Sequence, residues 1–351
     1  MKRFNMCQLA AYVGERPIAP LLLRALELQE PYYAGHATGL GVINGDSLEV
    51  VKDSGPVAKV KQSTEISSLE ATAGIAHSRY NAKARDDARY NAREMAHPFL
   101  NDSRDLALMH NGTIYNYKEH WTRLKESHAF QSYVEEIDSI TDSEVAVHML
   151  SDALEEGISM GEALRSVTTR LIGGFLLAAI TPEHPETVWI ANWFQPCVVA
   201  VGDDETMFCS SRIGFHDVHD ELDRVFEPPR NSILKLTPGK VEVTTMDPDR
   251  RVLDWEMDEG KAAELIIKAL KEEKELGINK LNNTLYPAGW AEIFSVSPET
   301  FDKEYKRGFR YVNEYFAFMD KLVKDGFIRE RIAMKDEGGF PYTPRFTYSI
   351  A

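Results

Sequence analysis

Apolar and polar positions along the first part of the chain group into short runs that are typical of strands and one helix. A strand-like run occupies residues 6–14, and an apolar stripe at helical spacing follows over 21–28. Two β-prone runs, 39–43 and 48–51, flank Asn44-Gly45, which is the strongest short signal for a hairpin. The pattern therefore predicts a strand, a helix and a hairpin in that order.

The middle of the chain continues with buried strands and two helices. Short apolar runs predict strands at 74–77, 106–110 and 175–180. The charged stretch 82–95 predicts a loop that could close over a site as a lid. The strand that begins at residue 106 is expected to break at Asn111-Gly112 and to continue to residue 117. Helices are predicted at 141–150, where capping-type residues open the run, and at 160–169.

Beyond residue 180 the pattern is mostly β until the composition changes near 247–249. Five runs separated by turn residues predict strands at 188–191, 197–201, 207–210, 233–236 and 241–243. Many short strands with helices outside them predict two sheets packed face to face. Two amphipathic helices are predicted at 261–274 and 300–323, the second with an aromatic stripe, before a tail at 338–351 that is rich in aromatic residues, proline and glycine.

Length and charge exclude several classes of function. The 351 residues suit one large or two modest domains, and the 43% share of apolar residues is enough for a core. The net charge of −15 argues against nucleic acid and anionic membranes as partners, because both bind cationic surfaces. The longest apolar run, 171–180, is too short to cross a bilayer, and the first residues lack the apolar segment of a secretory signal.

Cysteine usage indicates a reducing compartment and one candidate nucleophile. Cys7, Cys197 and Cys209 form neither an even-numbered disulfide framework nor a metal-binding spacing, so we expect a cytoplasmic protein with no metal and no cofactor. A thiol attacks as the thiolate and needs a base. An α-amine, with a pKa of roughly 7.7–8.0, would supply that base if Cys7 became the first residue. Taken alone, the segment fits a small buried hydrophobic cysteine better.

Four short stretches further define the chemistry. They are Met6-Cys7 with Tyr12-Val13-Gly14, Gly74-Ile75-Ala76-His77-Ser78-Arg79-Tyr80, Ala96-His97-Pro98-Phe99 followed by His110-Asn111-Gly112-Thr113-Ile114-Tyr115-Asn116-Tyr117, and Thr141-Asp142-Ser143-Glu144-Val145 ending in His148. In this order they resemble the class II glutamine amidotransferases, the glutaminase domains with an N-terminal nucleophile. The resemblance covers roughly residues 6–243. It implies the α+β fold of N-terminal-nucleophile hydrolases, a four-layer αββα sandwich of two mainly antiparallel sheets.

The resemblance also implies a domain division and a set of reacting groups. Residues 1–6 would be a leader that is removed, 7–250 the amidotransferase domain, and 251–351 a helical extension. Cys7 would attack the amide carbon of glutamine, while the Asn111 side-chain amide and the Gly112 N–H would bind the oxyanion. Losing one such donor costs about 3–4 kcal/mol of barrier. Two alternatives stay open: a leader that remains as a tail, and Asn111-Gly112 as an ordinary turn.

Free glutamine carries one charge of each sign, and the resemblance assigns a residue to each. Arg79 would bind the α-carboxylate bidentately, Asp142 would hold the α-ammonium, and Tyr80 would wall the site. Arg79 as a surface ion pair and Asp142 as a helix N-cap are the alternatives. His77 and His110 are interpreted as structural, because the Cys7 amine would serve as the base.

The chain departs from the family pattern at two places, and the second, a missing hydroxyl near the substrate carboxylate, bears on substrate preference. Gln8 stands where members commonly have glycine, and Asn81-Ala82 replaces the usual hydroxyl residue after the Arg-aromatic pair. The leading hypothesis is a subunit that hydrolyses glutamine through a thioester and supplies ammonia to a separate synthase. A hydrolase of another γ-glutamyl amide and a non-catalytic glutamine-binding scaffold are the alternatives. The aromatic helix and tail could dock that synthase or a second copy of the chain, or simply pack on the domain.

Overall fold

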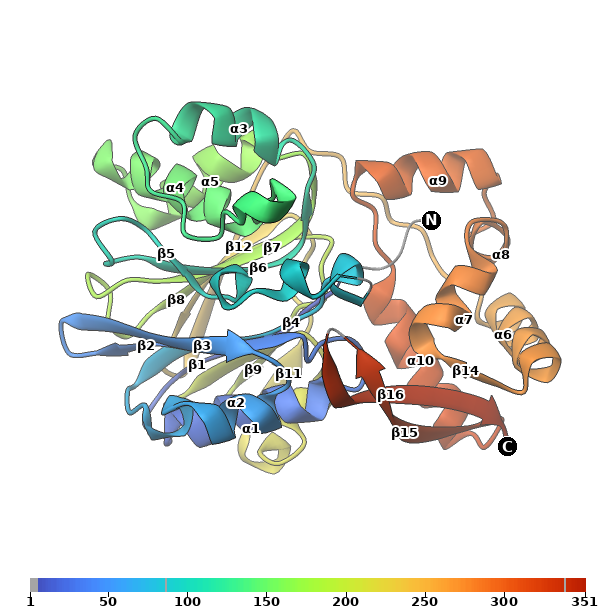
Figure 1. Cartoon of the computed structure of the whole chain (residues 1–351). Coiled ribbons are helices and arrows are strands. Elements are labelled where there is room, and N and C mark those ends of the chain that lie inside the picture. The colour runs from blue at the N-terminus through green and yellow to red at the C-terminus, as the bar shows by residue number, and fades with distance from the viewer. Residues whose placement is uncertain (1–5, 86, 338) are drawn as a thin grey trace.

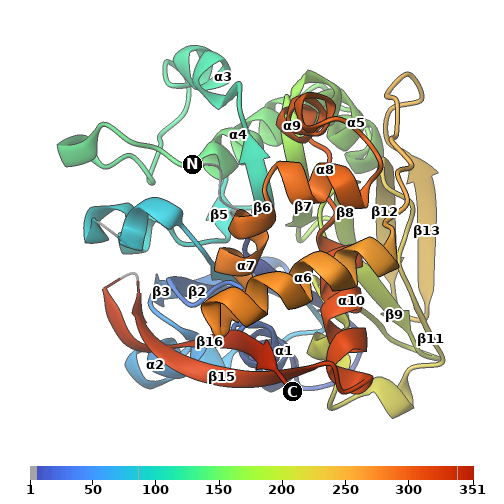
Figure 2. The same cartoon turned by 90° about the vertical axis from the view of Figure 1, so that its right-hand side faces the viewer.

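Two antiparallel sheets lie face to face at the centre of the molecule, with helices outside each of them (Figure 1). The computed structural model describes residues 6–85, 87–337 and 339–351. The four-layer α+β arrangement predicted from the sequence is confirmed. An extension formed by the last hundred or so residues lies at one side of the sandwich (Figure 1), the side that faces the viewer in Figure 2.

The first sheet holds the start of the chain at its centre. Its strand order is β11-β9-β10-β1-β4-β2-β3. The strands are β1 (Gln8–Val13), β2 (Ala37–Asn44), β3 (Ser47–Ser54), β4 (Ala73–Arg79), β9 (Val198–Val201), β10 (Thr206–Cys209) and β11 (Arg224–Phe226). β1 pairs with β4 on one side, with Gln8 opposite Ser78, and with β10 on the other. This register places Cys7 beside the end of β4, where Arg79 and Tyr80 lie.

The second sheet carries the Asn-Gly motif inside a strand. Its order is β13-β12-β8-β7-β6-β5. The strands are β5 (Phe99–Leu100), β6 (Ala107–Ile114), β7 (Gly173–Ile180), β8 (Val188–Trp193), β12 (Ser232–Thr237) and β13 (Lys240–Thr245). β6 pairs continuously with β7, with Asn111 opposite Leu176 and Gly112 opposite Phe175. The predicted break at Asn111-Gly112 is therefore wrong, and the strand ends at Ile114 instead of continuing to residue 117.

Buried apolar side chains fill each interface between layers. Between the sheets, Leu9 and Ala11 of β1 lie in one cluster with Met109 and Ala178 from the second sheet. Helices α1 (Ile18–Gln29) and α2 (Val57–Ser63) pack against the first sheet, and α4 (Asp142–Glu155) and α5 (Met160–Arg170) against the second; α3 (Tyr117–Leu124) lies on α4. Short 3-10 turns, which connect the elements outside the site, are η1 (Ile66–Ser68), η5 (Glu135–Ile137), η6 (Arg212–Phe215) and η7 (His219–Glu221).

The extension contains helices, as predicted, and also a small sheet. The helices are α6 (Glu259–Glu273), α7 (Ile278–Leu285), α8 (Ala288–Ile293), α9 (Pro298–Arg307) and α10 (Val312–Lys324), and the strands are β14 (Glu275–Gly277), β15 (Ile328–Glu337) and β16 (Phe340–Ile350). The sheet has the order β14-β16-β15, so the Pro/Gly-containing tail forms its central strand. None of the helices among the described residues is long and apolar enough to cross a membrane.

The single helix predicted at 300–323 is wrong, because the chain turns between α9 and α10. Gly308 has a φ of +121°, and a Cβ there would lie 2.5 Å from the Gly173 carbonyl oxygen. The helix cannot continue through this residue, and the close approach to β7 leaves room only for glycine.

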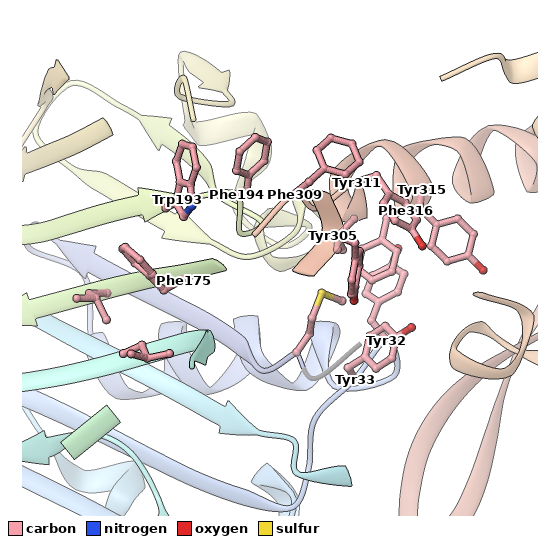
Figure 3. Close-up of a cluster of buried hydrophobic side chains, with 14 of the residues drawn as sticks. Tyr32, Tyr33, Phe175, Trp193, Phe194, Tyr305, Phe309, Tyr311, Tyr315 and Phe316 are labelled. Carbon is pink, nitrogen blue, oxygen red and sulfur yellow. The ribbon is translucent and has the colours of Figure 1, made fainter. Parts of the chain in front are cut away.

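The aromatic face of α10 packs on the amidotransferase-like sandwich itself. Figure 3 shows its rings beside those of the first domain, and the Tyr32 and Phe316 ring centroids are 4.3 Å apart. Phe316, Met319 and Leu322 are all buried. Strand β16 adds main-chain contacts, since the Phe346 N–H donates to the Pro31 carbonyl at 2.7 Å. The packing interpretation of the aromatic stripe is therefore confirmed.

Candidate active site

Five of the six residues predicted for the site line one pocket of about 180 Å³. They are Cys7, Arg79, Tyr80, Gly112 and Asp142. The sixth, Asn111, is fully buried beside Cys7, and its Oδ1 accepts a hydrogen bond from the Cys7 backbone N–H at 3.0 Å. Residues separated by more than one hundred positions in the chain are thus brought together by strands of the two facing sheets.

The Cys7 sulfur lies in a polar backbone niche. The Tyr80 N–H donates to Sγ at 3.4 Å, and the Tyr80 carbonyl lies 3.9 Å from it. Burial raises the pKa of the thiol to about 11, although the Tyr80 backbone and Arg79 act to lower it. While Cys7 is still preceded by other residues, its sulfur is a neutral thiol near pH 7. Attack of this sulfur on a substrate therefore requires a base placed next to it.

The residue before Cys7 occupies the protein interior. Met6 is 2% exposed and belongs to the same apolar cluster as Tyr32 and Tyr33. The rest of the predicted leader, residues 1–5, lies outside the described residues. The Cys7 nitrogen, which would become an α-amine after cleavage, faces the Asn111 side chain.

Asn111 and Gly112 lie inside strand β6, so the turn alternative is wrong. The Asn111 Nδ2 has no hydrogen-bond partner among the described residues, although the side chain is buried. Gly112 has a φ of +118°, and a Cβ there would lie 2.1 Å from the Gly174 carbonyl oxygen. The backbone conformation and the close approach of β7 both require glycine at this position.

Arg79 is not a surface ion pair. Its side chain ends in the pocket at 7% exposure, and Nη1 donates to the Tyr90 carbonyl at 2.8 Å. Burial lowers the pKa of the guanidinium, while Cys7 and Asp142 act in the opposite direction. The group stays charged, because even a lowered arginine pKa lies far above neutral pH.

Asp142 begins α4 but does not cap it. The cap is Thr141, whose Oγ1 accepts from the Glu144 N–H, so the N-cap interpretation of Asp142 is wrong. The Asp142 Oδ2 accepts from the Ile114 N–H at 2.8 Å. Burial acts to raise the pKa of Asp142, but His110 and the Ile114 N–H bring it below its ordinary value. An anion therefore faces the pocket from the side of α4.

Three buried histidines lie at the pocket, and two of them, His97 and His110, line it together with Ser143. The rings of His77 and His97 stack with centroids 3.9 Å apart, and the Ser143 Oγ lies 2.7 Å from His97 Nε2 and 3.0 Å from His110 Nδ1. Burial lowers the pKa of His77 to about 3, so this ring is neutral at physiological pH. His110 also lies 3.6 Å from Asp142 Oδ1, and the structural interpretation of His77 and His110 stays a prediction. The part played by Ser143 was not foreseen, because its position in a helix-start motif suggested only helix formation.

The charged loop predicted as a lid forms one wall of the pocket. It contains η2 (Ala82–Arg85), η3 (Ala88–Asn91) and η4 (Arg93–Met95), with residue 86 outside the described residues. Lys83 and Tyr90 line the pocket, and the Tyr90 carbonyl accepts from both Arg79 and Asn81. The loop is thus tied to the end of β4, and its closing motion stays a prediction.

Tyr80 connects the site with the C-terminal extension. Its ring stacks on His36 with centroids 4.9 Å apart, and the Arg345 guanidinium of β16 lies 6.0 Å from the ring centroid. Arg345 itself donates to the Ala34 carbonyl at 2.7 Å. The extension therefore supports the aromatic wall of the pocket from behind.

Comparison with known proteins relates the chain to glutamine amidotransferases. A model of the glutamine amidotransferase domain matches residues 87–215. The glutamine–fructose-6-phosphate aminotransferase of Chlorobaculum tepidum is 32% identical over 248 residues, which are 69% of this chain and 36% of that relative. The chain carries a class II glutamine amidotransferase domain.

A further curated relative and a solved structure also resemble this amidotransferase domain. The glutamine–fructose-6-phosphate aminotransferase of Bacteroides thetaiotaomicron is 29% identical over 252 residues, or 71% of this chain and 37% of that relative. The chain thus spans little more than a third of the length of these curated relatives. A solved glutamine phosphoribosylpyrophosphate amidotransferase from B. subtilis superposes with a TM-score of 0.60 at 16% identity, covering 83% of this chain and 65% of that one, which shows a shared fold.

Proposed function

We propose that this chain hydrolyses the side-chain amide of glutamine through a thioester on Cys7 and supplies the ammonia to a synthase on a separate polypeptide. The observation that carries the proposal is the position of Cys7. Its nitrogen lies 3.0 Å from Asn111 Oδ1, and its sulfur opens on a pocket with one buried cation and one anion. The proposal includes removal of residues 1–6, which frees the Cys7 α-amine.

The chain's own groups account for each proton in the first half of the reaction. The α-amine of Cys7 takes the thiol proton, and Sγ bonds to the amide carbon of glutamine. The negative charge that develops on oxygen is stabilised by the Asn111 Nδ2 and the Gly112 N–H. The protonated amine then gives its proton to the departing nitrogen, and ammonia leaves as the carbon–nitrogen bond breaks.

Water completes the second half. The Cys7 amine takes a proton from water, whose oxygen attacks the thioester carbon, and the carbon–sulfur bond breaks. Glutamate leaves and the thiol is restored. Arg79 would hold the α-carboxylate throughout, and Asp142 the α-ammonium, so that the amide is presented to the sulfur in one orientation.

The acceptor of ammonia is proposed to lie on another polypeptide. The names of the relatives pair glutamine with different acceptors, fructose 6-phosphate in one case and phosphoribosylpyrophosphate in the other, so the shared domain does not define the acceptor. The residues after 250 pack their aromatic face on the amidotransferase domain itself. Affinity purification of the native protein from its own cells tests this: a stably bound synthase supports it, and a synthase fused to the same chain contradicts it.

Substitution of the nucleophile tests the hydrolytic function. We expect Cys7→Ala to abolish release of glutamate from glutamine, while calorimetry still detects glutamine binding through Arg79 and Asp142. Cys197→Ala is the matched control, because Cys197 is a buried cysteine outside the pocket lining and its loss should leave turnover intact. Unchanged turnover in Cys7→Ala would refute the assignment. Turnover only with other γ-glutamyl amides would favour the second hypothesis.

A further inference from the structure

A second group of potential ligand side chains lies outside the amidotransferase pocket. Asp102 comes from the turn between β5 and β6, His128 from the segment after α3, and His148 from α4. One nitrogen or oxygen atom from each of the three lies within 4.8 Å of the other two. These residues are widely spaced in the sequence, which is why no metal-binding spacing was apparent there.

The Asp102 carboxylate faces both imidazoles. Its Oδ2 lies 2.7 Å from His128 Nδ1 and 3.9 Å from His148 Nδ1. The other oxygen, Oδ1, accepts from the Ala129 N–H at 3.2 Å, which orients the carboxylate. Two ligand atoms around a tetrahedral zinc ion, each about 2.0–2.1 Å from it, are about 3.3 Å apart. The two separations from Asp102 bracket this value, and the ligand atoms of the two imidazoles lie within 4.8 Å of each other.

The buried imidazole of His148 is not explained by hydrogen bonding within the protein. It is 1% exposed, and neither ring nitrogen makes a hydrogen bond of normal geometry with a described residue, although the Ala129 backbone approaches the ring. A buried polar group without a partner destabilises a fold unless a ligand completes it.

His128 already has the supporting contact that metal-bound histidines usually make. Its Nε2 lies 2.8 Å from Asp152 Oδ1. A carboxylate that accepts the N–H of one ring nitrogen fixes the tautomer and leaves the lone pair of the other nitrogen for a metal. Here that other nitrogen is Nδ1, the atom that faces Asp102.

We propose that Asp102, His128 and His148 form a binding site for one divalent transition-metal ion of the zinc type, with Asp152 orienting His128 and water completing the coordination. Two imidazoles and one carboxylate are a donor set that suits zinc, and three protein ligands leave one position open. The Asp102 side chain is 43% exposed, so solvent reaches the site.

The ion would join three segments that no disulfide connects. One of them is α4, which carries His148 in its middle and Asp142 at its first turn, on the wall of the amidotransferase pocket. The metal would therefore stabilise the helix that presents Asp142 without contacting glutamine. This site is independent of the proposed hydrolytic mechanism.

Calorimetric titration of the full chain with zinc chloride, after removal of metal by a chelator, tests the proposal. We expect one equivalent to bind and to raise the melting temperature. His148→Ala and Asp102→Asn should each remove this binding, and Asp152→Asn should weaken it by about 10–100-fold. His219→Ala is the matched control, because His219 is an exposed histidine that contacts Asp220, and its loss should change nothing.

If His148→Ala fails to fold, Asp102→Asn still provides the test. Asp102 is exposed, and the amide oxygen of asparagine can still accept a hydrogen bond from the Ala129 N–H, so this variant is expected to fold. Cobalt(II) gives a second readout, since binding to the three ligands would produce a d–d absorption spectrum that Asp102→Asn abolishes. Absence of saturable one-to-one binding would overturn the proposal. So would equal affinity in Asp102→Asn and the unsubstituted chain, which would indicate binding at other surface histidines.

Discussion

At the scale of single residues, the two ends of the Asn111 amide have different surroundings. Oδ1 accepts from the Cys7 N–H, whereas Nδ2 is buried without a partner among the described residues. A buried donor left unpaired is costly unless a ligand completes it. This asymmetry agrees with a donor kept for the oxygen of a bound substrate, and the amide orientation follows from the contact with Cys7.

Replacement of that donor gives a sharp test at this scale. Asn111→Asp keeps an oxygen for the Cys7 N–H but removes Nδ2, so we expect kcat for glutamine hydrolysis to fall by about 10²–10³-fold with a much smaller change in KM. Asn44→Asp, at an exposed position at the end of β2, is the control and should retain full activity. Steady-state kinetics with thermal melting of both variants would separate a catalytic loss from unfolding. An unaltered kcat in Asn111→Asp would contradict the role of Nδ2.

The sequence predicted which residues meet at the site but not how they are held. The positions of Cys7, Arg79 and Asp142 followed from motif order. The capping by Thr141 and the contacts of Ser143 did not, because hydroxyl and carboxyl side chains near a helix start are interchangeable as sequence signals. Only the packed structure decides which of them faces the helix and which faces the pocket.

At the scale of elements, Asn111-Gly112 shows how one dipeptide serves two structures. At Asn44-Gly45 the dipeptide lies at a hairpin end, as the pattern predicts, whereas at 111–112 it lies inside β6. Glycine is required in both places for a positive φ. The difference comes from the neighbouring strand β7, whose approach to Gly112 is a tertiary contact that the local sequence cannot reveal.

A matched pair of substitutions measures that contact. Gly112→Ala would place a Cβ 2.1 Å from the Gly174 oxygen, whereas Gly45→Ala, also at positive φ, meets nothing within 4 Å. We expect Gly45→Ala to cost about 1 kcal/mol through backbone strain, and Gly112→Ala to cost at least about 3 kcal/mol or to prevent folding. Urea denaturation followed by circular dichroism provides the comparison. Equal losses in the two variants would show that β7 does not constrain Gly112.

At the scale of the whole molecule, the extension and the amidotransferase domain share a hydrophobic cluster. The alternation of apolar residues was sufficient to predict two packed sheets, because inward and outward positions repeat along each strand. It did not predict β16, since a tail with proline and glycine is a poor strand by composition. That strand depends on distant contacts, such as the Phe346 N–H with the Pro31 carbonyl and Arg345 with Ala34.

The contribution of the shared cluster to stability is measurable with two phenylalanines. Phe316 is 5% exposed and stacks on Tyr32, whereas Phe327 is 54% exposed just after α10. We expect Phe316→Ala to lower the free energy of unfolding by about 3–5 kcal/mol, and Phe327→Ala to change it by no more than about 0.5 kcal/mol. Chemical denaturation of the full chain measures both. If Phe316→Ala lowered the free energy of unfolding as little as Phe327→Ala, the contact between Phe316 and Tyr32 would not stabilise the extension.

The central claim is that Cys7, as the first residue of the mature chain, forms a thioester with the γ-carbonyl of glutamine. Rapid acid quenching of the native protein with glutamine, followed by peptide mass spectrometry, tests it most directly. We predict a γ-glutamyl adduct on the sulfur of an N-terminal peptide that begins at Cys7. Glutamate release without such an adduct, from a chain that still carries Met6, would contradict it.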